Sequence, residues 1–331
     1  MRSVKLGSND QTVSAAGLGC MAMSGGYGAP DDAESIATIH AAMEAGITLL
    51  DTGDFYGMGH NEMLIGEALK GGKRARAFLS VKFGALWSPD GAMTGYDLRP
   101  AAVKNFLAYT LRRLKTDYID LYQPARYDRA VPIEDTLGTI SDLIKAGYVR
   151  HIGLSEVSAR TLNRAAQNFP IAALQIEYSL ASRGLEKDIL PAARALGIPV
   201  VAYGVLSRGL ISDATLNGGM GGAIRSRMPR FSGENFARNR ALVEALARIA
   251  KVRGISVSQL AFAWLRTRGD DIVPLIGART RAQLADGLAG LDLTLTDFER
   301  AAIERAMPKD AMAGERYGPA AMKHLDSELV G

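Results

Sequence analysis

Eight short β-rich runs alternate along the chain with longer segments that carry apolar residues at three- and four-residue spacing. This alternation predicts a parallel sheet connected by helices, either closed into a barrel or open and doubly wound. The predicted strands are residues 16–20, 48–51, 78–82, 119–122, 151–155, 173–177, 199–203 and 272–276. The clearest predicted helices are residues 31–44, 61–69, 99–114, 133–146, 158–168 and 235–251.

The end of the first predicted strand separates the two arrangements. An open dinucleotide-binding sheet carries G-x-G-x-x-G there, with an acidic residue roughly 20 positions later. The strand ends instead in Gly17-Leu-Gly-Cys-Met-Ala-Met, which does not match that pattern. The sequence therefore predicts a single α/β domain over residues 1–331, a (β/α)8 TIM barrel, and this length is ordinary for the fold.

Local sequence signals mark the ends of some helices, and two segments lie outside the alternation of strands and helices. Ala45-Gly46 and Ala146-Gly147 suit left-handed helix C-caps, and Ser158 suits an N-cap. Residues 3–6 and 12–15 predict a β-hairpin that caps the barrel's N-terminal end. Residues 204–233 are rich in Gly and Arg with little apolar period, which is typical of a functional lid or a disordered loop.

Composition narrows the class of protein. The 39 basic and 35 acidic residues are scattered and leave a net charge of +4, which argues against nucleic acid as a partner. Cys20 is the only cysteine, so no internal disulfide is expected, and the 4 histidines share no metal-ligand spacing. The N-terminal residues lack a signal-peptide core, and no apolar run reaches membrane-spanning length. We therefore expect a soluble cytoplasmic protein without a metal site.

Polar residues gather where the predicted strands end, which is where barrel enzymes carry their reactive groups. They are Asp51 with Tyr56, Lys82, Gln123 to Arg126, Ser155 with Glu156, Gln175 to Tyr178, Tyr203 and Ile276 to Arg279. The runs before them are apolar, so we expect one polar mouth on an apolar barrel.

Asp51, Tyr56 and Lys82 form a chemically coherent set within this group. A carbonyl that accepts hydride needs a proton donor for its oxygen, and a tyrosine with a pKa of about 10 donates poorly near neutral pH. A nearby lysine ammonium would lower that pKa, and a carboxylate would keep the lysine charged. Taken singly, a loop tyrosine or lysine is usually structural or solvated.

Over its whole length the chain resembles the aldo-keto reductase superfamily. The longest matching motif is Asp51-Thr-Gly-Asp-Phe-Tyr-Gly-Met-Gly-His-Asn-Glu-Met-Leu-Ile-Gly-Glu-Ala-Leu. Further motifs are Leu111-Arg-Arg-Leu-Lys-Thr-Asp-Tyr-Ile-Asp-Leu-Tyr, Gly147-Tyr-Val-Arg-His-Ile-Gly-Leu-Ser, Gln175-Ile-Glu-Tyr-Ser-Leu and Arg230-Phe-Ser-Gly-Glu-Asn-Phe. The middle motifs are similar to those of bacterial and fungal members that include pyridoxal reductases.

The resemblance implies an NADPH-dependent carbonyl reductase in which Tyr56 is the general acid, Lys82 tunes it and Asp51 pairs with Lys82. The family also has a histidine in the loop after the fourth strand, where this chain has Ala125. Three replacements stay open: His60, which is more readily explained as a surface residue, and Arg126 or Gln123, either of which would orient the carbonyl oxygen.

Cofactor positions carry over one by one. Tyr203 resembles the aromatic residue that stacks on the nicotinamide, and Ser155 with Gln175 resembles the carboxamide-binding pair. Glu156 stands where many members have Asn, and it would still accept a hydrogen bond from the carboxamide. Ser207 and Arg208 resemble the segment along the pyrophosphate.

The adenosine end of the cofactor is implied by Ile276-Gly277-Ala-Arg279-Thr-Arg-Ala-Gln283. Arg279 would bind the 2′-phosphate, because a guanidinium fork matches phosphate oxygens, and Gln283 would face the adenine. Gly287 replaces a frequent Asn in the same region. Residues 204–233 resemble the loop that folds over bound cofactor, with Arg225, Arg227 and Arg230 either gripping it or simply solvated.

The expected substrate is an aldehyde or ketone, with pyridoxal and bulkier ketones as candidates and with Trp87, Arg126 and Tyr127 lining its pocket. The alternative function is an NADPH-binding regulatory protein with little or no turnover, which Ala125 favours and the Asp51, Tyr56 and Lys82 set opposes. Monomer and homo-oligomer stay equally open. A barrel enzyme for phosphorylated sugars leaves Tyr203 and the tyrosine–lysine pair unexplained.

Overall fold

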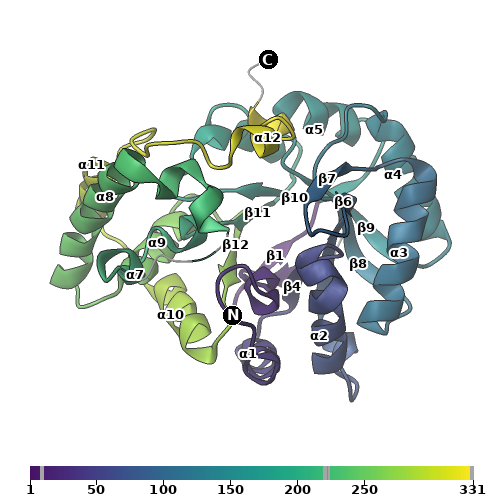
Figure 1. Ribbon diagram of the computed structural model, residues 1–331, viewed down its shortest axis with the longest axis horizontal. Coiled ribbons are helices and arrows are strands. Elements are labelled where there is room, and N and C mark those ends of the chain that lie inside the picture. The colour runs from purple at the N-terminus through teal and green to yellow at the C-terminus, as the bar shows by residue number, and fades with distance from the viewer. Residues whose placement is uncertain (8–10, 219–221, 223, 329–331) are drawn as a thin grey trace.

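The computed structural model describes residues 1–7, 11–218, 222 and 224–328, and its centre is a closed barrel of eight parallel strands (Figure 1). The strands follow one another around the barrel in chain order and the last, β12, closes it against the first, β3, which confirms the predicted TIM barrel. They are β3 (Gly17–Gly19), β4 (Leu49–Gly53), β5 (Phe78–Phe83), β8 (Ile119–Pro124), β9 (Val149–Ser155), β10 (Ile171–Glu177), β11 (Val200–Tyr203) and β12 (Ile272–Gly277). Every predicted strand is confirmed to within a few residues.

Helices surround the barrel on its outer side (Figure 1). They are α1 (Asp32–Glu44), α2 (His60–Ala68), α3 (Pro100–Leu114), α4 (Ile133–Lys145), α5 (Ala159–Ala166), α6 (Ile189–Ala195), α8 (Gly233–Val252), α9 (Val257–Arg266), α10 (Arg281–Asp292) and α11 (Asp297–Ala306), with the short α7 (Asp213–Leu216) and α12 (Pro319–Met322). The predicted caps are present: Ser158 accepts from the Thr161 amide, and Gly46 and Gly147 have φ of 88° and 84°.

The side chains inside the barrel change from apolar to polar along the strands. In β5, Phe78 belongs to the inner hydrophobic cluster, and Ser80 and Lys82 follow at two-residue spacing on the same face. In β4, Leu49 likewise precedes Asp51. The N-terminal end of the barrel is therefore filled with apolar groups, and the C-terminal end carries the polar ones.

Two small antiparallel sheets flank the barrel. β1 (Ser3–Lys5) pairs with β2 (Thr12–Ser14), which confirms the predicted hairpin, and its apolar side chains join the inner cluster. β6 (Ala85–Trp87) pairs with β7 (Met93–Tyr96) directly after β5, at the C-terminal end of the barrel. No sequence signal marks this second hairpin, because its strands are short and largely exposed and lack alternation.

The described part of residues 204–233, expected to be a functional lid or a disordered loop, has short ordered helical turns. That part contains α7 and three short 3-10 helices, Ser207–Gly209, Arg225–Arg227 and Pro229–Phe231. After α11 the chain crosses to α12, beside the start of α5, where Asp326 accepts from the Ser158 amide at 2.7 Å (Figure 1). We call residues 307–328 the C-terminal segment.

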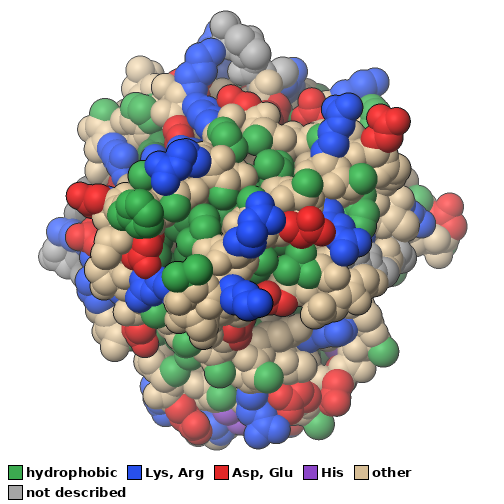
Figure 2. All heavy atoms as spheres, turned by 90° about the vertical axis from the view of Figure 1, so that its left-hand side faces the viewer, with side chains coloured by type: hydrophobic (Ala, Val, Ile, Leu, Met, Phe, Trp, Pro, Cys, Tyr) green, Lys and Arg blue, Asp and Glu red, His purple; other side chains and the backbone are tan. Residues whose placement is uncertain are grey.

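The surface over α8 and α11 shows basic and acidic side chains interspersed, not gathered by sign (Figure 2). This arrangement agrees with the scattered charges of the sequence and offers no basic stripe on that face. No helix in the described part of the chain is both long and apolar enough to cross a bilayer.

Candidate active site

Asp51, Lys82 and Gln175 form a closed hydrogen-bonded group at the C-terminal end of the barrel. Lys82 Nζ lies 2.5 Å from Asp51 Oδ1 and donates to Gln175 Oε1 at 2.9 Å. Gln175 Nε2 donates to Asp51 Oδ2 at 2.6 Å, and all three side chains are buried. Burial lowers the pKa of Lys82, and the charge of Asp51 acts in the opposite direction.

Tyr56 lies beside this group, with Lys82 Nζ 5.2 Å from the centre of its ring. The turn after Tyr56 needs a left-handed backbone at Gly57, where φ is 56° and a Cβ would lie 2.8 Å from Ser24 Cβ. This glycine turn therefore holds Tyr56 over the barrel mouth.

The pKa of Tyr56 is raised well above its usual value, first by burial and then by the charge of Asp51. Arg126 is the cation that acts to lower this pKa. The family resemblance predicts this influence for Lys82, whose charge is paired with Asp51 in the structure.

Ser80, on the same strand as Lys82, connects the polar group to Gln123 on the neighbouring strand β8. Ser80 Oγ donates to Asp51 Oδ2 at 3.2 Å and accepts from Gln123 Nε2 at 3.0 Å. Gln123 is thus held inside the barrel below the mouth, while Ala125 is buried just beyond the strand.

His60 begins α2 and is held away from this group. Its Nδ1 lies 2.9 Å from Ser24 Oγ, and its Nε2 lies 3.3 Å from Asp32 at the start of α1. These partners favour the interpretation of His60 as a structural residue of the surface loop. They give no support to His60 as the replacement for the absent histidine.

The residues predicted to hold the nicotinamide lie on three adjacent strands, β9 to β11. Ser155 Oγ is fully buried and has no hydrogen-bond partner among the described residues. A buried hydroxyl of this kind normally has a partner, so a ligand group that supplies one would fit here. Gln175 lies next to it, and the Tyr203 hydroxyl donates to Glu156 Oε1 at 2.7 Å.

Glu156 does not stand ready for a carboxamide, contrary to the expectation from the sequence. Its oxygens accept from Arg316 at 2.8 and 3.1 Å, from Ser327 Oγ at 2.5 Å and from the Glu177 amide at 2.9 Å. Burial alone would raise the pKa of Glu156, but Arg316 holds it well below its usual range. This carboxylate therefore anchors the C-terminal segment.

Sequence reasoning missed Arg316 and Tyr317, which the C-terminal segment brings to the barrel mouth. The Tyr317 hydroxyl lies 2.9 Å from that of Tyr203, and the guanidinium carbon of Arg208 lies 4.7 Å from the centre of the Tyr317 ring. Neither residue lies in a motif or at a strand end, and their partners on the barrel, Glu156 and Tyr203, are more than 100 positions away in the sequence, so no local pattern marks them.

Ser207 and Arg208 lie together in a strained turn after β11, with φ of 44° and 59°. Such left-handed backbone in ordinary residues gathers at functional sites. Arg208 donates to Tyr27 Oη at 3.1 Å, and its carbonyl oxygen accepts from Arg225 Nε at 2.8 Å. Arg230 is buried against Ser182, whereas Arg227 is exposed, so the loop arginines differ in role.

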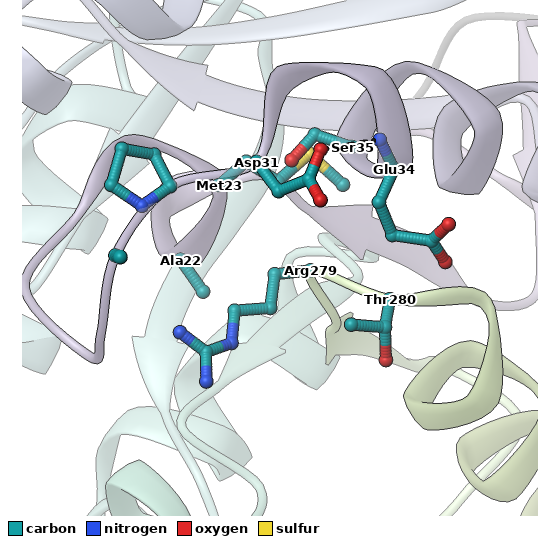
Figure 3. Close-up of a pocket in the computed structure, with 9 residues that line it drawn as sticks. Ala22, Met23, Asp31, Glu34, Ser35, Arg279 and Thr280 are labelled. Atoms are coloured by element: carbon teal, nitrogen blue, oxygen red, sulfur yellow. Dashed lines mark hydrogen bonds between the residues drawn. The ribbon is translucent and has the colours of Figure 1, made fainter.

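Arg279 lines a cavity of about 300 Å³ between the segment after β3, the start of α1 and the turn before α10 (Figure 3). Its guanidinium extends into this space, close to Gly28, while Gln283 Oε1 accepts from the Arg279 amide at 3.1 Å. Gly277 is exposed at the end of β12. The fully buried Ser35 Oγ also lines the cavity without a partner among the described residues.

The three residues predicted to line the substrate pocket lie in different surroundings. Arg126 is at the mouth, where it donates to Tyr317 Oη at 3.4 Å. Trp87 is 39% exposed on β6. Tyr127 packs against the hydrophobic core and lies near Arg164 of α5. Arg126 is thus joined to the group at the mouth, and pocket roles for Trp87 and Tyr127 stay predictions.

Three solved structures resemble this chain over most of its length. A glycerol dehydrogenase from Gluconobacter oxydans is 30% identical with a TM-score of 0.79, covering 99% of this chain and 97% of its own. A thermostable aldo-keto reductase in complex with epalrestat is 29% identical with a TM-score of 0.73, covering 92% and 100%. An aldo-keto reductase from Bacillus halodurans, in its holo form, is 26% identical with a TM-score of 0.74, covering 93% and 96%.

A family model agrees with these structural matches. The model of the aldo/keto reductase family matches residues 15–307, which include the whole barrel and the Asp51–Lys82–Gln175 group. The chain therefore belongs to the aldo-keto reductase family of oxidoreductases.

Proposed function

We propose that this chain is an NADPH-dependent carbonyl reductase that converts an aldehyde or ketone to an alcohol. The observation that carries the proposal is the buried Asp51–Lys82–Gln175 group with Tyr56 over it. A binding protein without turnover has no need to bury a lysine–carboxylate pair beside a tyrosine ring, since isolating such charges from water is costly.

Tyr56 supplies the proton. Because burial raises its pKa, the hydroxyl stays protonated at neutral pH and is available to donate to the carbonyl oxygen. Arg126 favours the tyrosinate that forms when the proton leaves, since its charge acts to lower the same pKa. Hydrogen bonds with Gln175 hold the charged groups of Lys82 and Asp51 in fixed positions beside Tyr56.

The residues present fit a dinucleotide. When bound, its reduced nicotinamide supplies the hydride that the carbonyl carbon receives. Ser155 offers a buried hydroxyl without a partner among the described residues, Ser207 and Arg208 form the strained turn, and Arg279 projects into a cavity. A guanidinium in that cavity favours the 2′-phosphate of NADPH over the hydroxyl of NADH.

The decisive experiment compares wild type with Tyr56→Phe in NADPH consumption on a panel of aldehydes that includes pyridoxal and glyceraldehyde. Tyr109→Phe is the matched control, since Tyr109 is 56% exposed on α3. We expect turnover in wild type and control, and a loss of at least about 100-fold in kcat for Tyr56→Phe with NADPH binding retained.

Two results would redirect the proposal. Tight NADPH binding with no turnover on any carbonyl would favour the regulatory binding protein, with Ala125 marking lost chemistry. Turnover that survives in Tyr56→Phe would remove Tyr56 from the role of general acid. Glycerol with NADP+ belongs in the panel as the reverse reaction, because one similar structure is a glycerol dehydrogenase.

A further inference from the structure

Arg126 is a half-buried guanidinium at the barrel mouth whose hydrogen-bond acceptors are all neutral. Its Nη1 donates to the Ala125 carbonyl oxygen at 2.6 Å and its Nη2 to Tyr317 Oη at 3.4 Å. Within the described part of the chain, no carboxylate oxygen lies within 4.0 Å of the Arg126 guanidinium nitrogens, which is the limit for an ion pair. An arginine cannot lose its proton in a protein, so its charge at this place is permanent.

The carboxylates of the mouth are already shared by other arginines. Arg316 pairs with Glu156 at 2.8 Å, with Glu177 at 3.2 Å and with Glu328 at 2.6 Å. Arg230 and Arg208 lie 3.7 and 3.9 Å from Glu177. Glu156 acts on Arg126 electrostatically, but its oxygens are occupied by Arg316, Ser327 and Tyr203. Among the described residues, the mouth thus holds more guanidinium than carboxylate charge, and Arg126 is the arginine without an ion-pair partner.

Arg126 also stands next to the reacting groups. The Ala125 amide donates to the Phe83 carbonyl oxygen at 2.8 Å, so Arg126 follows the strand that pairs with the strand of Lys82. Its charge acts to lower the pKa of both Tyr56 and Lys82. A carbonyl placed to receive the proton of Tyr56 would therefore carry its substituents past Arg126.

We propose that the preferred substrates carry an oxyanion, a carboxylate or a phosphate monoester, and that Arg126 binds this group while Tyr56 faces the carbonyl. The inference rests on the proposed carbonyl reduction and names its substrate class. A guanidinium presents paired N–H donors that match two oxygens of either anion. The specificity follows from charge. A neutral substrate leaves Arg126 without an ion-pair partner, whereas an anionic substrate forms an ion pair with it.

The test uses aldehydes that differ in one negative group. One pair is 4-carboxybenzaldehyde and methyl 4-formylbenzoate, and the other is glyceraldehyde 3-phosphate and glyceraldehyde. Steady-state kcat/KM is measured with saturating NADPH for wild type, Arg126→Gln and Arg126→Lys. Arg129→Gln is the matched control, because Arg129 is exposed on the same loop and its removal changes the net charge equally.

We expect wild type to prefer the anionic member of at least one pair, and the pair that shows it identifies the anion. Arg126→Gln should remove roughly 10- to 100-fold of that preference, mainly through KM, on top of a fall in kcat that both members of a pair share because Tyr56 loses a neighbouring cation. Arg126→Lys should keep part of it, and Arg129→Gln should keep nearly all. Equal preference within both pairs in wild type would overturn the inference.

Other outcomes assign Arg126 differently and also overturn it. An equal loss for both members of a pair would make Arg126 a carbonyl-orienting group. A rise in the KM for NADPH alone would place it on the cofactor. If wild type reduces none of the aldehydes, the carbonyl-reduction proposal fails by itself. Calorimetric titration of 4-carboxybenzyl alcohol into the protein with NADP+ then tests the anion site, and equal affinity in wild type and Arg126→Gln would refute it.

Discussion

Asp54 is a buried carboxyl group two residues before Tyr56 in the chain. No side chain among the described residues hydrogen-bonds to its oxygens, and only the Phe55 and Gly84 backbone amides approach them. Burial raises its pKa to about 8, the charge of Glu62 adds to this rise, and Arg113 opposes it. At neutral pH the folded protein therefore keeps Asp54 largely protonated, whereas the unfolded chain ionises it near the ordinary aspartate pKa of 3.8.

At the scale of single residues we predict that Asp54→Asn stabilises the fold in a pH-dependent way. Because the folded pKa is raised, the wild type loses stability as the pH rises from about 4 to about 8. Asparagine resembles the protonated carboxyl and removes this loss. Urea unfolding should show Asp54→Asn gaining about 1–4 kcal/mol over wild type at pH 8.5 relative to pH 5.

The exposed Asp142→Asn on α4 serves as the control and should follow wild type at both pH values. If Asp54→Asn instead loses stability with pH in parallel with wild type, Asp54 ionises in the fold without cost.

At the scale of elements, the C-terminal segment depends on the buried charge of Arg316. Arg316 is 7% exposed and pairs with Glu156, which follows β9, with Glu177 at the end of β10, and with Glu328 of the same segment. Removing one partner of a buried pair leaves an uncompensated charge, which costs about 3–5 kcal/mol. The segment thus stays over the barrel mouth through charges held away from water.

We therefore predict that Arg316→Met lowers the free energy of unfolding by about 3–5 kcal/mol and makes the C-terminal segment sensitive to protease. Adding Glu156→Gln should restore part of the loss, because the unpaired carboxylate is then removed. Chemical unfolding of the two single variants and the double variant forms a double-mutant cycle. A double variant no more stable than Arg316→Met would show that Glu156 is not the group left unpaired.

Elements with local periodicity could be predicted from the sequence, and contacts between distant elements could not. The strand containing Lys82 and the helix capped by Ser158 follow from spacing and capping chemistry alone. Glu156 and Arg316 are 160 positions apart, so the pair exists only because the barrel and the C-terminal segment meet. The family resemblance placed a carboxamide ligand at position 156, and this distant arginine changes its role.

The same division applies inside the candidate site. Two-residue spacing along β4 and β5 explains why Asp51 and Lys82 meet at one end of the barrel, and the sequence predicted this. The long-range influence of Arg126 on Tyr56 depends on how a loop folds back over the mouth, and no spacing rule reports it.

At the scale of the whole molecule, basic groups connect the barrel mouth to the cavity beside α1. Arg208 and Arg225 share Tyr27, through a hydrogen bond of 3.1 Å and a guanidinium 5.1 Å from the ring centre. The charge of Arg279 acts, after burial, to lower the pKa of Arg225. Arginines of several elements thus lie between the barrel mouth and the cavity, as the proposed binding of a dinucleotide requires.

This arrangement predicts a cofactor preference that depends on salt. Arg279→Ala should raise the KM for NADPH roughly 10- to 100-fold and leave the KM for NADH nearly unchanged, because NADH lacks the 2′-phosphate. Exposed Arg240→Ala on α8 is the control for net charge.

The wild-type KM for NADPH should also rise more steeply than that for NADH between low and high salt, since screening weakens the extra charge contact. Arg279→Ala should bring the two slopes together. Equal slopes in wild type would mean that the 2′-phosphate does not meet these arginines, and the cofactor would then be recognised without regard to its phosphate.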